Sequence, residues 1–255
     1  MLYSPIQPMH IPDGFLSTLV SIILWVVSAG AVAYALQRVG KDLGERQVPL
    51  MGVLAATIFA GQMLNFSVTG GTSGHLLGAA IATILLGPWA AVIIMTSVVS
   101  IQALVFQDGG VLALGANIFN MAVVGVAVSY FVYTSLRKMI GDKSWSIFVS
   151  GAAAAWCSIV FASLACALEL ALSGLSANIV IPAMGGIHAL IGIGEGLITV
   201  GALAFLYSAR RDLLTGGSTV PTGGAAVWTF GLGIALFLAI LSPLASSHPD
   251  GLEWV

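Results

Sequence analysis

The chain has 255 residues, of which 58% are hydrophobic and only 7% are charged. An ordinary soluble domain carries charges at about a quarter of its positions, so this composition excludes a soluble fold that faces water on all sides. The net charge of −2, without a basic patch, gives no indication of nucleic-acid binding. The sequence predicts an all-α, polytopic membrane protein, because a helix in lipid satisfies its own backbone hydrogen bonds.

Apolar stretches follow one another along the chain, and about 20 apolar residues suffice to cross a bilayer core of ~30 Å. Gly87-Pro88 and the stretch from Gln107 to Gly110 predict breaks between helices. We expect seven or eight helical segments, at residues 17–37, 48–65, 75–86, 88–106, 111–136, 145–173, 182–208 and 225–244. Segment 75–86 would be only ~18 Å long as a helix, which favours a partial crossing inside the bundle.

The Lys and Arg residues predict the orientation of the chain in the membrane. They fall into three clusters, Arg38-Lys41-Arg46, Arg137-Lys138-Lys143 and Arg210-Arg211. Cytoplasmic loops carry an excess of Lys and Arg, so we expect all three clusters inside the cell and both termini outside. The long polar connections 1–16, 66–74 and 245–255 then lie on the outer face, where a site that captures an imported solute belongs.

Two of the four histidines, His10 and His75, are predicted to lie at this outer face. Imidazole is a versatile ligand for Ni²⁺, Co²⁺, Cu²⁺ and Zn²⁺, so a shared metal site is one interpretation. The alternative is two interfacial histidines that hydrogen-bond to loop carbonyls. Cys157 and Cys166 are interpreted as packing residues, because nine residues of one helix separate them by ~13 Å, too far for a disulfide.

Four long motifs resemble the substrate-capture subunits of cobalt and nickel energy-coupling-factor transporters, the CbiM/NikM family. They are MHIPDGFLS from Met9, GGTSGHLLGAAIATILLGPWAAVIIM from Gly70, QDGGVLALGANIFNMAVVG from Gln107 and IHALIGIGEGLIT from Ile187. The resemblance covers residues 9–210 and implies a metal-capture transmembrane domain over that range. Residues 1–8 are then an amino-terminal extension, and 211–244 are a cytoplasmic loop with a last transmembrane helix.

The resemblance implies a four-nitrogen, roughly planar metal site. Carried over to this chain, Met9 supplies its amino group, His10 its backbone nitrogen and imidazole, and His75 a second imidazole. Such a chelate suits Ni²⁺ and Cu²⁺, accommodates Co²⁺ and excludes Ca²⁺ and Mg²⁺, which prefer oxygen ligands. Because these nitrogens bind metal only when unprotonated, affinity should fall below about pH 6.5.

The eight residues MLYSPIQP before Met9 depart from the family pattern, since they make the Met9 nitrogen an amide. Three explanations stay open: translation starts at Met9, the extension is removed, or another group is the fourth ligand. Translation from Met9 is the simplest, and an intact extension should weaken metal binding.

Other polar residues are candidates for supporting roles. His188 and Glu195 share one face of a helix and form a candidate intramembrane polar site, interpreted as a clamp between helices rather than a metal relay. Asn65 and Asp108 are candidates to orient the ligating histidines, with ordinary interhelical hydrogen bonding as the equal alternative. For Gln102, Asn117 and Asn120 the ordinary role is favoured, and Glu169 is expected to reach interfacial water.

The partners of the chain follow from what it lacks and from the resemblance. There is no GxxxxGK[ST] motif and hence no ATP site, so ATP hydrolysis would come from ATPase subunits. In the resembling family small residues on the first helix face the transmembrane coupling subunit, which makes Ala29 and Ala33 candidate contacts. Residues 245–255 include PDGLEWV, which resembles the small accessory subunit of cobalt transporters, whereas an exposed role is expected for His248.

We therefore predict a bacterial plasma-membrane protein, not an enzyme, that binds Co²⁺ for uptake linked to cobalamin synthesis. The same role for Ni²⁺ is the main alternative. A stand-alone secondary transporter is disfavoured, because only Glu195 is a good mid-membrane carboxylate and no internal repeat is visible. A membrane metalloenzyme would need a further cluster of acids or histidines near His188.

Overall fold

The computed structural model describes residues 10–42, 47–63, 66–68, 72–141, 143–211 and 214. The regular secondary structure of the described residues is helical apart from one short antiparallel hairpin of β1 and β2, in which Phe66 pairs with Gly74. The elements in order are α1 (Thr18–Asp42), α2 (Gln47–Gln62), β1 (Phe66–Val68), β2 (Thr72–Gly74), α3 (Ala79–Val105), α4 (Leu114–Ile118), the π-helical η1 (Phe119–Val124), α5 (Gly125–Ile140), α6 (Ser146–Leu172) and α7 (Ala177–Ala209).

Five helical stretches of the described residues are long and apolar enough to cross a membrane: Thr18–Val39, Ala79–Val105, Leu114–Ile140, Ser146–Leu172 and Ala177–Ala209. The apolar helix α2 is shorter, at 16 residues. The helical membrane fold is thus confirmed, but seven or eight segments are not, and segment 225–244 lies outside the described residues. The hairpin lies in the predicted loop 66–74. It was not predicted, because strands of three residues are too short to give a periodic pattern in the sequence.

Glycine and proline shape two of the long helices. Gly87 has φ 78° and ψ 169°, so the predicted break before Pro88 divides α3 into two helical pieces. Proline fits there because the first residues of a helix have no intrahelical partner for their N–H groups. The predicted start of the last described helix at Pro182 is wrong, since α7 begins at Ala177 and includes that proline.

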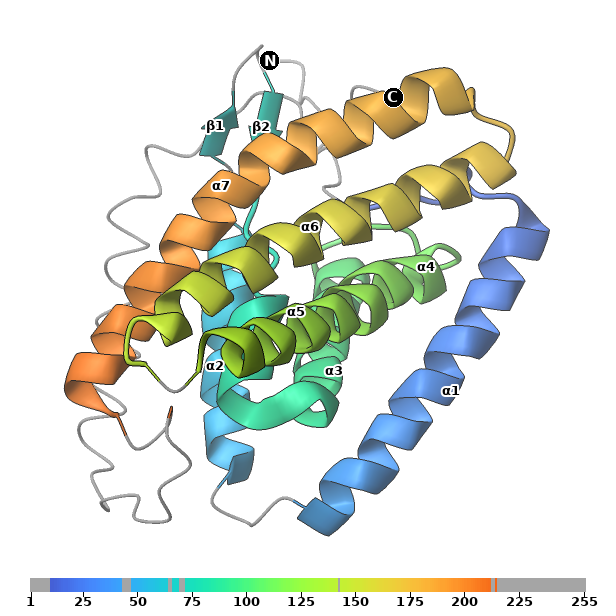
Figure 1. Cartoon of the computed structure of the whole chain (residues 1–255). Helices are drawn as coiled ribbons and strands as arrows, with labels where there is room; N and C mark the ends of the chain where they lie inside the picture. Colours follow the sequence, from blue (N-terminus) through green and yellow to red (C-terminus); the bar gives the residue numbers. More distant parts are fainter. Residues whose placement is uncertain are drawn as a thin grey trace, which may run out of the picture.

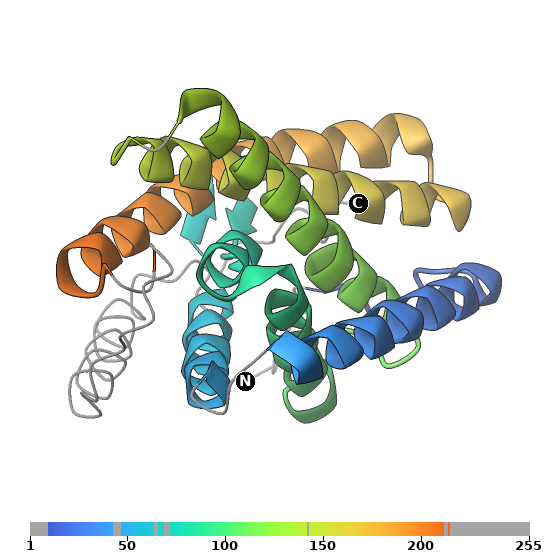
Figure 2. The same cartoon turned by 60° about the horizontal axis from the view of Figure 1, so that its bottom comes forward.

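The helices pack in pairs around α3. Helices α6 and α7 lie side by side along their lengths, α5 packs on α6, and α1 runs along the opposite side of the molecule (Figures 1 and 2). Small residues permit these approaches: a side chain on Gly151 of α6 would meet Leu203 of α7 at 2.4 Å. Ile94, Met95 and Val98 of α3 lie in the largest hydrophobic cluster.

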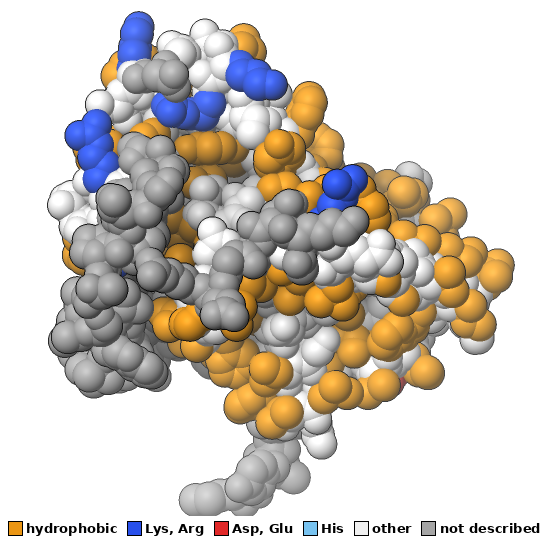
Figure 3. Space-filling model, turned by 90° about the horizontal axis from the view of Figure 1, so that it is seen from below, with side chains coloured by type: hydrophobic (Ala, Val, Ile, Leu, Met, Phe, Trp, Pro, Cys, Tyr) orange, Lys and Arg blue, Asp and Glu red, His pale blue; other side chains and the backbone are white. Residues whose placement is uncertain are grey.

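Many of the side chains on the surface of the helix bundle are apolar. Large hydrophobic side chains are exposed on every long helix, including Leu19 at 69%, Phe131 at 70% and Leu197 at 69%. On the face drawn in Figure 3, apolar side chains dominate and Lys and Arg side chains gather mostly toward one edge. A surface of this kind is stable against lipid, which requires no charges.

Candidate metal site

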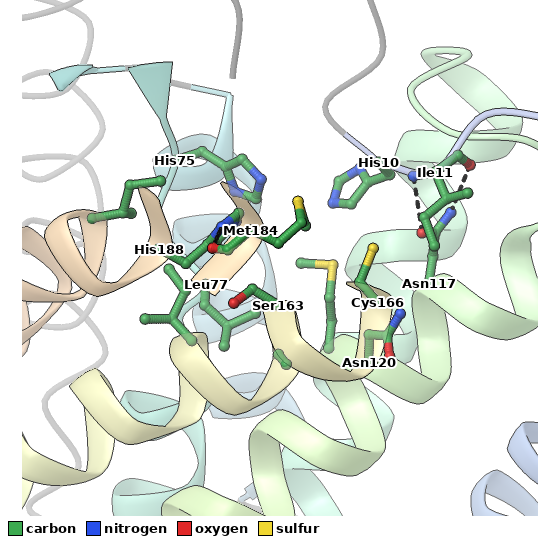
Figure 4. A pocket seen from close by; sticks show the side chains of 14 residues that line it. His10, Ile11, His75, Leu77, Asn117, Asn120, Ser163, Cys166, Met184 and His188 are labelled. Carbon is green, nitrogen blue, oxygen red and sulfur yellow. Dashed lines mark hydrogen bonds between the residues drawn. The ribbon is translucent and has the colours of Figure 1, made fainter. Parts of the chain in front are cut away.

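One cavity brings together three of the four histidines. His10, His75 and His188 line it with side chains of η1, α6 and α7, and its volume of about 80 Å³ exceeds the roughly 10–15 Å³ that one water needs. The rings of His10 and His75 face each other across the cavity, and His188 lies next to His75 (Figure 4). The full lining is His10, Ile11, His75, Leu77, Asn117, Asn120, Met121, Ile159, Ala162, Ser163, Cys166, Met184, His188 and Ile191.

Two nitrogens of His10 face the same carboxylate. The backbone N–H donates to Asp108 Oδ1 over 3.3 Å, and ring Nδ1 lies 3.3 Å from Asp108 Oδ2. The ring is buried, and Nε2 has no hydrogen-bond partner among the described residues. Asp108 thereby holds the backbone nitrogen and Nδ1 on one side of His10, the arrangement that a chelate through both nitrogens requires.

Asn117 of α4 clamps the next residue of the entering segment. Its Oδ1 accepts from the N–H of Ile11, and its Nδ2 donates to the carbonyl of Ile11, both over 3.1 Å. The N–H of Gly110 donates to the same carbonyl over 2.9 Å. Gly109, with φ 102°, lies so close that a Cβ there would be 2.9 Å from the Cβ of His10.

Asp13 joins the same two segments from the other side. Its carboxylate accepts from the backbone N–H groups of Val111, Leu112 and Ala113, over 2.8 to 3.2 Å, in the turn before α4. The segment from His10 to Asp13 is therefore fixed to the turn that follows α3. Sequence reasoning assigned Asn117 to ordinary interhelical hydrogen bonding and gave Asp13 no role, although both lie in the motifs that carry the family resemblance.

His75 enters the cavity from the irregular stretch between β2 and α3. Its ring centroid lies 5.4 Å from that of His10, with the ring planes at 60°. Nδ1 lies 3.0 Å from the carbonyl of Leu76. A carbonyl only accepts, so in the neutral ring the hydrogen sits on Nδ1 and Nε2 carries the lone pair that a metal needs.

The His75 ring stays neutral over a wide pH range. Burial lowers its pKa to about 4, and the neighbouring His10 acts in the same direction, whereas the Leu76 carbonyl and Asp108 oppose the shift. A metal ion competes poorly with a proton at an ordinary imidazole below its pKa. The lowered pKa removes that competition at His75 down to about pH 4.

Glu195 and His188 do not form one polar site. Glu195 of α7 is fully buried, and its Oε2 and Oε1 accept from the N–H groups of Leu77 and Gly78 over 2.8 and 2.9 Å. It satisfies the backbone just before α3 and is absent from the cavity lining. Glu195 therefore joins α7 to the backbone before α3, while His188 faces the cavity and its Nδ1 lies 2.8 Å from the Met184 carbonyl of its own helix.

The remaining candidates have varied positions. Glu169 is buried and accepts from Asn120 over 2.8 Å, so the expectation that it reaches interfacial water is wrong. Gln102 is buried within α3, and Ala29 and Ala33 are exposed on α1. Cys157 and Cys166 form no disulfide, as predicted. Met9, Asn65 and His248 lie outside the described residues.

Side chains alone do not complete a metal site within the described ranges. No group of three or more His, Cys, Asp or Glu residues there is arranged to hold one ion. Two imidazoles with ring centroids 5.4 Å apart are present instead, and the backbone N–H of His10 donates to Asp108. This donor set is poor in oxygen and suits a transition-metal ion rather than Ca²⁺ or Mg²⁺.

Comparisons with known proteins converge on metal transport. Residues 10–213 match the family model for CbiM, described as the cobalt uptake substrate-specific transmembrane region. The cobalt transport protein CbiM of Geobacter sulfurreducens is 32% identical over 88% of this chain and 66% of that protein. The fused nickel transport protein NikMN of Rhodobacter capsulatus is 31% identical over 96% of this chain and 75% of that protein.

A solved structure shares the fold as well as the sequence. A crystal structure of a truncated transition metal transporter superposes with a TM-score of 0.71 at 35% identity. The match covers 78% of this chain and 99% of that chain.

Proposed function

Because the chain belongs to the CbiM family of substrate-specific transmembrane regions for cobalt uptake, we propose that it is the metal-binding subunit of an energy-coupling-factor transporter that imports Co²⁺. Met9, His10 and His75 supply the proposed ligands. The observation that carries this proposal is the pair of imidazoles, 5.4 Å apart between ring centroids, that line one cavity.

The ring spacing fits two imidazoles on one ion. A metal–nitrogen bond of roughly 2.0–2.1 Å puts a ring centre about 3.2 Å from the ion, so two ring centres can lie up to ~6.4 Å apart. The separation of 5.4 Å is within that limit. In the planar chelate the two imidazoles are neighbours around the ion, for which the ring centres lie ~4.5 Å apart, so the rings are expected to approach each other by about 1 Å when the ion binds.

In the proposed chelate the ion binds Nδ1 and the backbone nitrogen of His10, which releases its proton to water, and Asp108 gives up its two contacts with His10. The contacts of Asp108 and Asn117 with the segment support a role for both in orienting His10 before the ion arrives. A preorganised ligand set loses less entropy on binding. The nitrogen of Met9 completes the set only as a free amine, as produced by translation from that residue.

The proposed orientation has both termini outside a bacterial plasma membrane. Arg38 lies near the end of α1, Arg137 and Lys138 lie in the last turn of α5, and Arg210 follows α7. The excess of Lys and Arg in cytoplasmic loops puts these three helix ends inside the cell. The cavity with His10 and His75 then opens toward the outside.

Energy for uptake is proposed to come from a transmembrane coupling subunit and ATPase subunits, with Ala29 and Ala33 as contacts for the coupling subunit. Both alanines are exposed on α1, which supports their availability to a partner. The PDGLE-like stretch in residues 245–255 supports a small accessory subunit. Vesicles with this chain alone should show no ATP-driven accumulation, and accumulation without partners would contradict the assignment.

Nickel is the competing cargo, because similar proteins are named for either metal. Planar nitrogen ligands bind Ni²⁺ more strongly than Co²⁺, so affinity does not identify the cargo. The PDGLE-like stretch favours cobalt. Competitive uptake of both radiolabelled metals by cells with the complete transporter is the test, and a clear preference for nickel would reverse the cargo assignment.

The site itself is tested by calorimetry on protein that begins at Met9. His10→Ala and His75→Ala should each abolish high-affinity binding of Co²⁺ and Ni²⁺, whereas the control His248→Ala should bind like the unchanged protein. Unchanged affinity in either of the first two variants would remove that residue from the site.

A further inference from the structure

We propose that His188 is an inner ligand for the ion, used after capture when the ion leaves the His10 side of the cavity and passes toward the membrane interior. This inference rests on the proposed function, since it concerns the path of the same cargo. His10, His75 and His188 line one continuous cavity of about 80 Å³, which holds an ion together with a few waters.

The ring of His188 is set up as a ligand in the same way as that of His75. Its Nδ1 lies 2.8 Å from the carbonyl of Met184, which only accepts, so in the neutral ring Nε2 carries the lone pair. Metal-binding histidines usually engage their other ring nitrogen with an oxygen in this manner. At His75 the corresponding acceptor is the carbonyl of Leu76.

The hydrogen bond of His188 does little for the fold. Its partner Met184 is one turn earlier on the same helix, so the bond joins no two elements. Glu195, on the same helix, instead bonds to the backbone at the start of α3. Ionisable residues within membrane helices are costly, and one that links no helices has a functional role by default.

The lining of the cavity also suits a transition metal. Met121, Cys166 and Met184 add thioether and thiol sulfur to the cavity lining, and Figure 4 shows the Met184 and Cys166 side chains directed into it. Sulfur and imidazole bind transition-metal ions and reject Mg²⁺ and Ca²⁺. An ion that leaves the capture site on this side therefore remains among donors selective for its class.

His75 is placed to bind the ion both at the outer site with His10 and at the inner position with His188. Its ring faces that of His10 and lies next to His188 (Figure 4). The ion can keep its bond to His75 while Nε2 of His188 replaces nitrogen of the His10 segment. At the rings this step exchanges one neutral imidazole for another, and the backbone nitrogen of His10, deprotonated while it binds the ion, takes up one proton from water as the ion leaves.

The test separates capture from passage. His188→Asn and His188→Gln are compared with the unchanged protein in two assays: calorimetry of Co²⁺ and Ni²⁺ binding, and uptake by the complete transporter. Affinity at the outer site should change less than about threefold, whereas uptake should fall at least tenfold in both variants. Ser158→Ala is the matched control and should leave both affinity and uptake unchanged, because Ser158 is buried, bonds to the Ala155 carbonyl of its own helix and does not line the cavity.

A second measurement detects the inner position directly. Protein with His10→Ala should retain weak Co²⁺ binding, with an absorption spectrum typical of imidazole ligation, and adding His188→Asn should remove it. Uptake at the unchanged rate in both His188 variants would overturn the inference, as would loss of high-affinity capture equal to that of His75→Ala. Failure of the unchanged protein to bind either metal would instead refute the proposed function.

Discussion

The segments that carry His10 and His75 are both irregular backbone, but they are held in different ways. The His10 segment lies against one turn and the start of α4, through Asp13, Asp108 and Asn117. Asp13 is exposed, and this contact lies at the edge of the helix bundle. Residues 10–13, called the strap below, are therefore held by polar bonds to the turn after α3 and to the start of α4.

The His75 segment is instead fixed from the middle of the bundle. Glu195 of α7 accepts two N–H groups, and Gln62 of α2 donates to the carbonyl of Leu77 over 2.7 Å. Both side chains are fully buried. Irregular backbone at membrane depth persists only where protein groups satisfy it, so here the site and the fold depend on the same bonds. Changes at the His75 segment should therefore reduce stability and affinity together, whereas changes at the His10 segment should reduce affinity more selectively.

The largest effect is expected for Glu195→Ala. It leaves the N–H groups of Leu77 and Gly78 buried without an acceptor, which costs about 1–3 kcal/mol for each. Both the thermal midpoint and metal affinity should fall, and Glu195→Gln should restore part of each because one acceptor remains. The matched control is Thr199→Val, one turn further along α7 and also fully buried. If Glu195→Ala lowered metal affinity without lowering stability, the His75 segment would be held in the same way as the His10 segment, and the contrast between them would be wrong.

Asn117→Ala should weaken metal binding by about tenfold with a smaller loss of stability. It removes both hydrogen bonds to Ile11. The buried N–H of Ile11 is then left without an acceptor, which costs about 1–3 kcal/mol, whereas the Ile11 carbonyl keeps the N–H of Gly110. Calorimetry and thermal unfolding of the same preparation measure the two effects. A fall in the thermal midpoint as large as that of Glu195→Ala would contradict the selective role of the strap.

Gly109→Ala tests the close approach of the strap. Gly109 and Gly174 both have positive φ, at 102° and 108°, so alanine costs about 1–2 kcal/mol at either position. Only at Gly109 would the added carbon meet His10, whereas nothing lies within 4 Å at Gly174. Metal affinity should therefore fall in Gly109→Ala and stay unchanged in Gly174→Ala. Equal metal affinities of Gly109→Ala and Gly174→Ala would show that the strap moves to accommodate the added carbon without loss of binding.

At neutral pH the smallest effect is expected from the titration of His75, which reaches its full size only near pH 4. The pKa of His75 is about 4 in the folded protein and 6.5 in an unperturbed chain, so between these values the unfolded state binds more protons. By linkage, stability of the metal-free protein should be complete above pH 6.5 and decline as pH falls toward 4. His75→Gln should flatten this part of the thermal-midpoint profile. A profile unchanged by that substitution would mean that the ring is not buried in its neutral form.

Part of this outcome was predictable from residue patterns. The apolar composition predicted a helical membrane protein, and the motifs around His10 and His75 predicted membership of the CbiM family, a transporter component and not an enzyme; the family match confirms both. The Gly87-Pro88 break was also predictable, because proline disfavours a helical conformation in the residue before it. The metal ligands and the division into four regions stay predictions.

Other features depended on contacts that no local pattern encodes. The roles of Asn117 and Glu195 arise from partners 106 and 118 residues away in the chain. Isolated polar residues in apolar segments look alike in sequence, so Glu169 was assigned to water and is in fact bonded to Asn120.

The sequence by itself determined that lipid surrounds this protein, that its fold is helical and which family it belongs to, because composition and long motifs are local properties of the chain. Only the tertiary structure decided that Glu195 supports the backbone while His188 faces the cavity, although both are on α7. The physical reason is that a buried polar group takes its role from the partner that satisfies it, and that partner is fixed by helix packing.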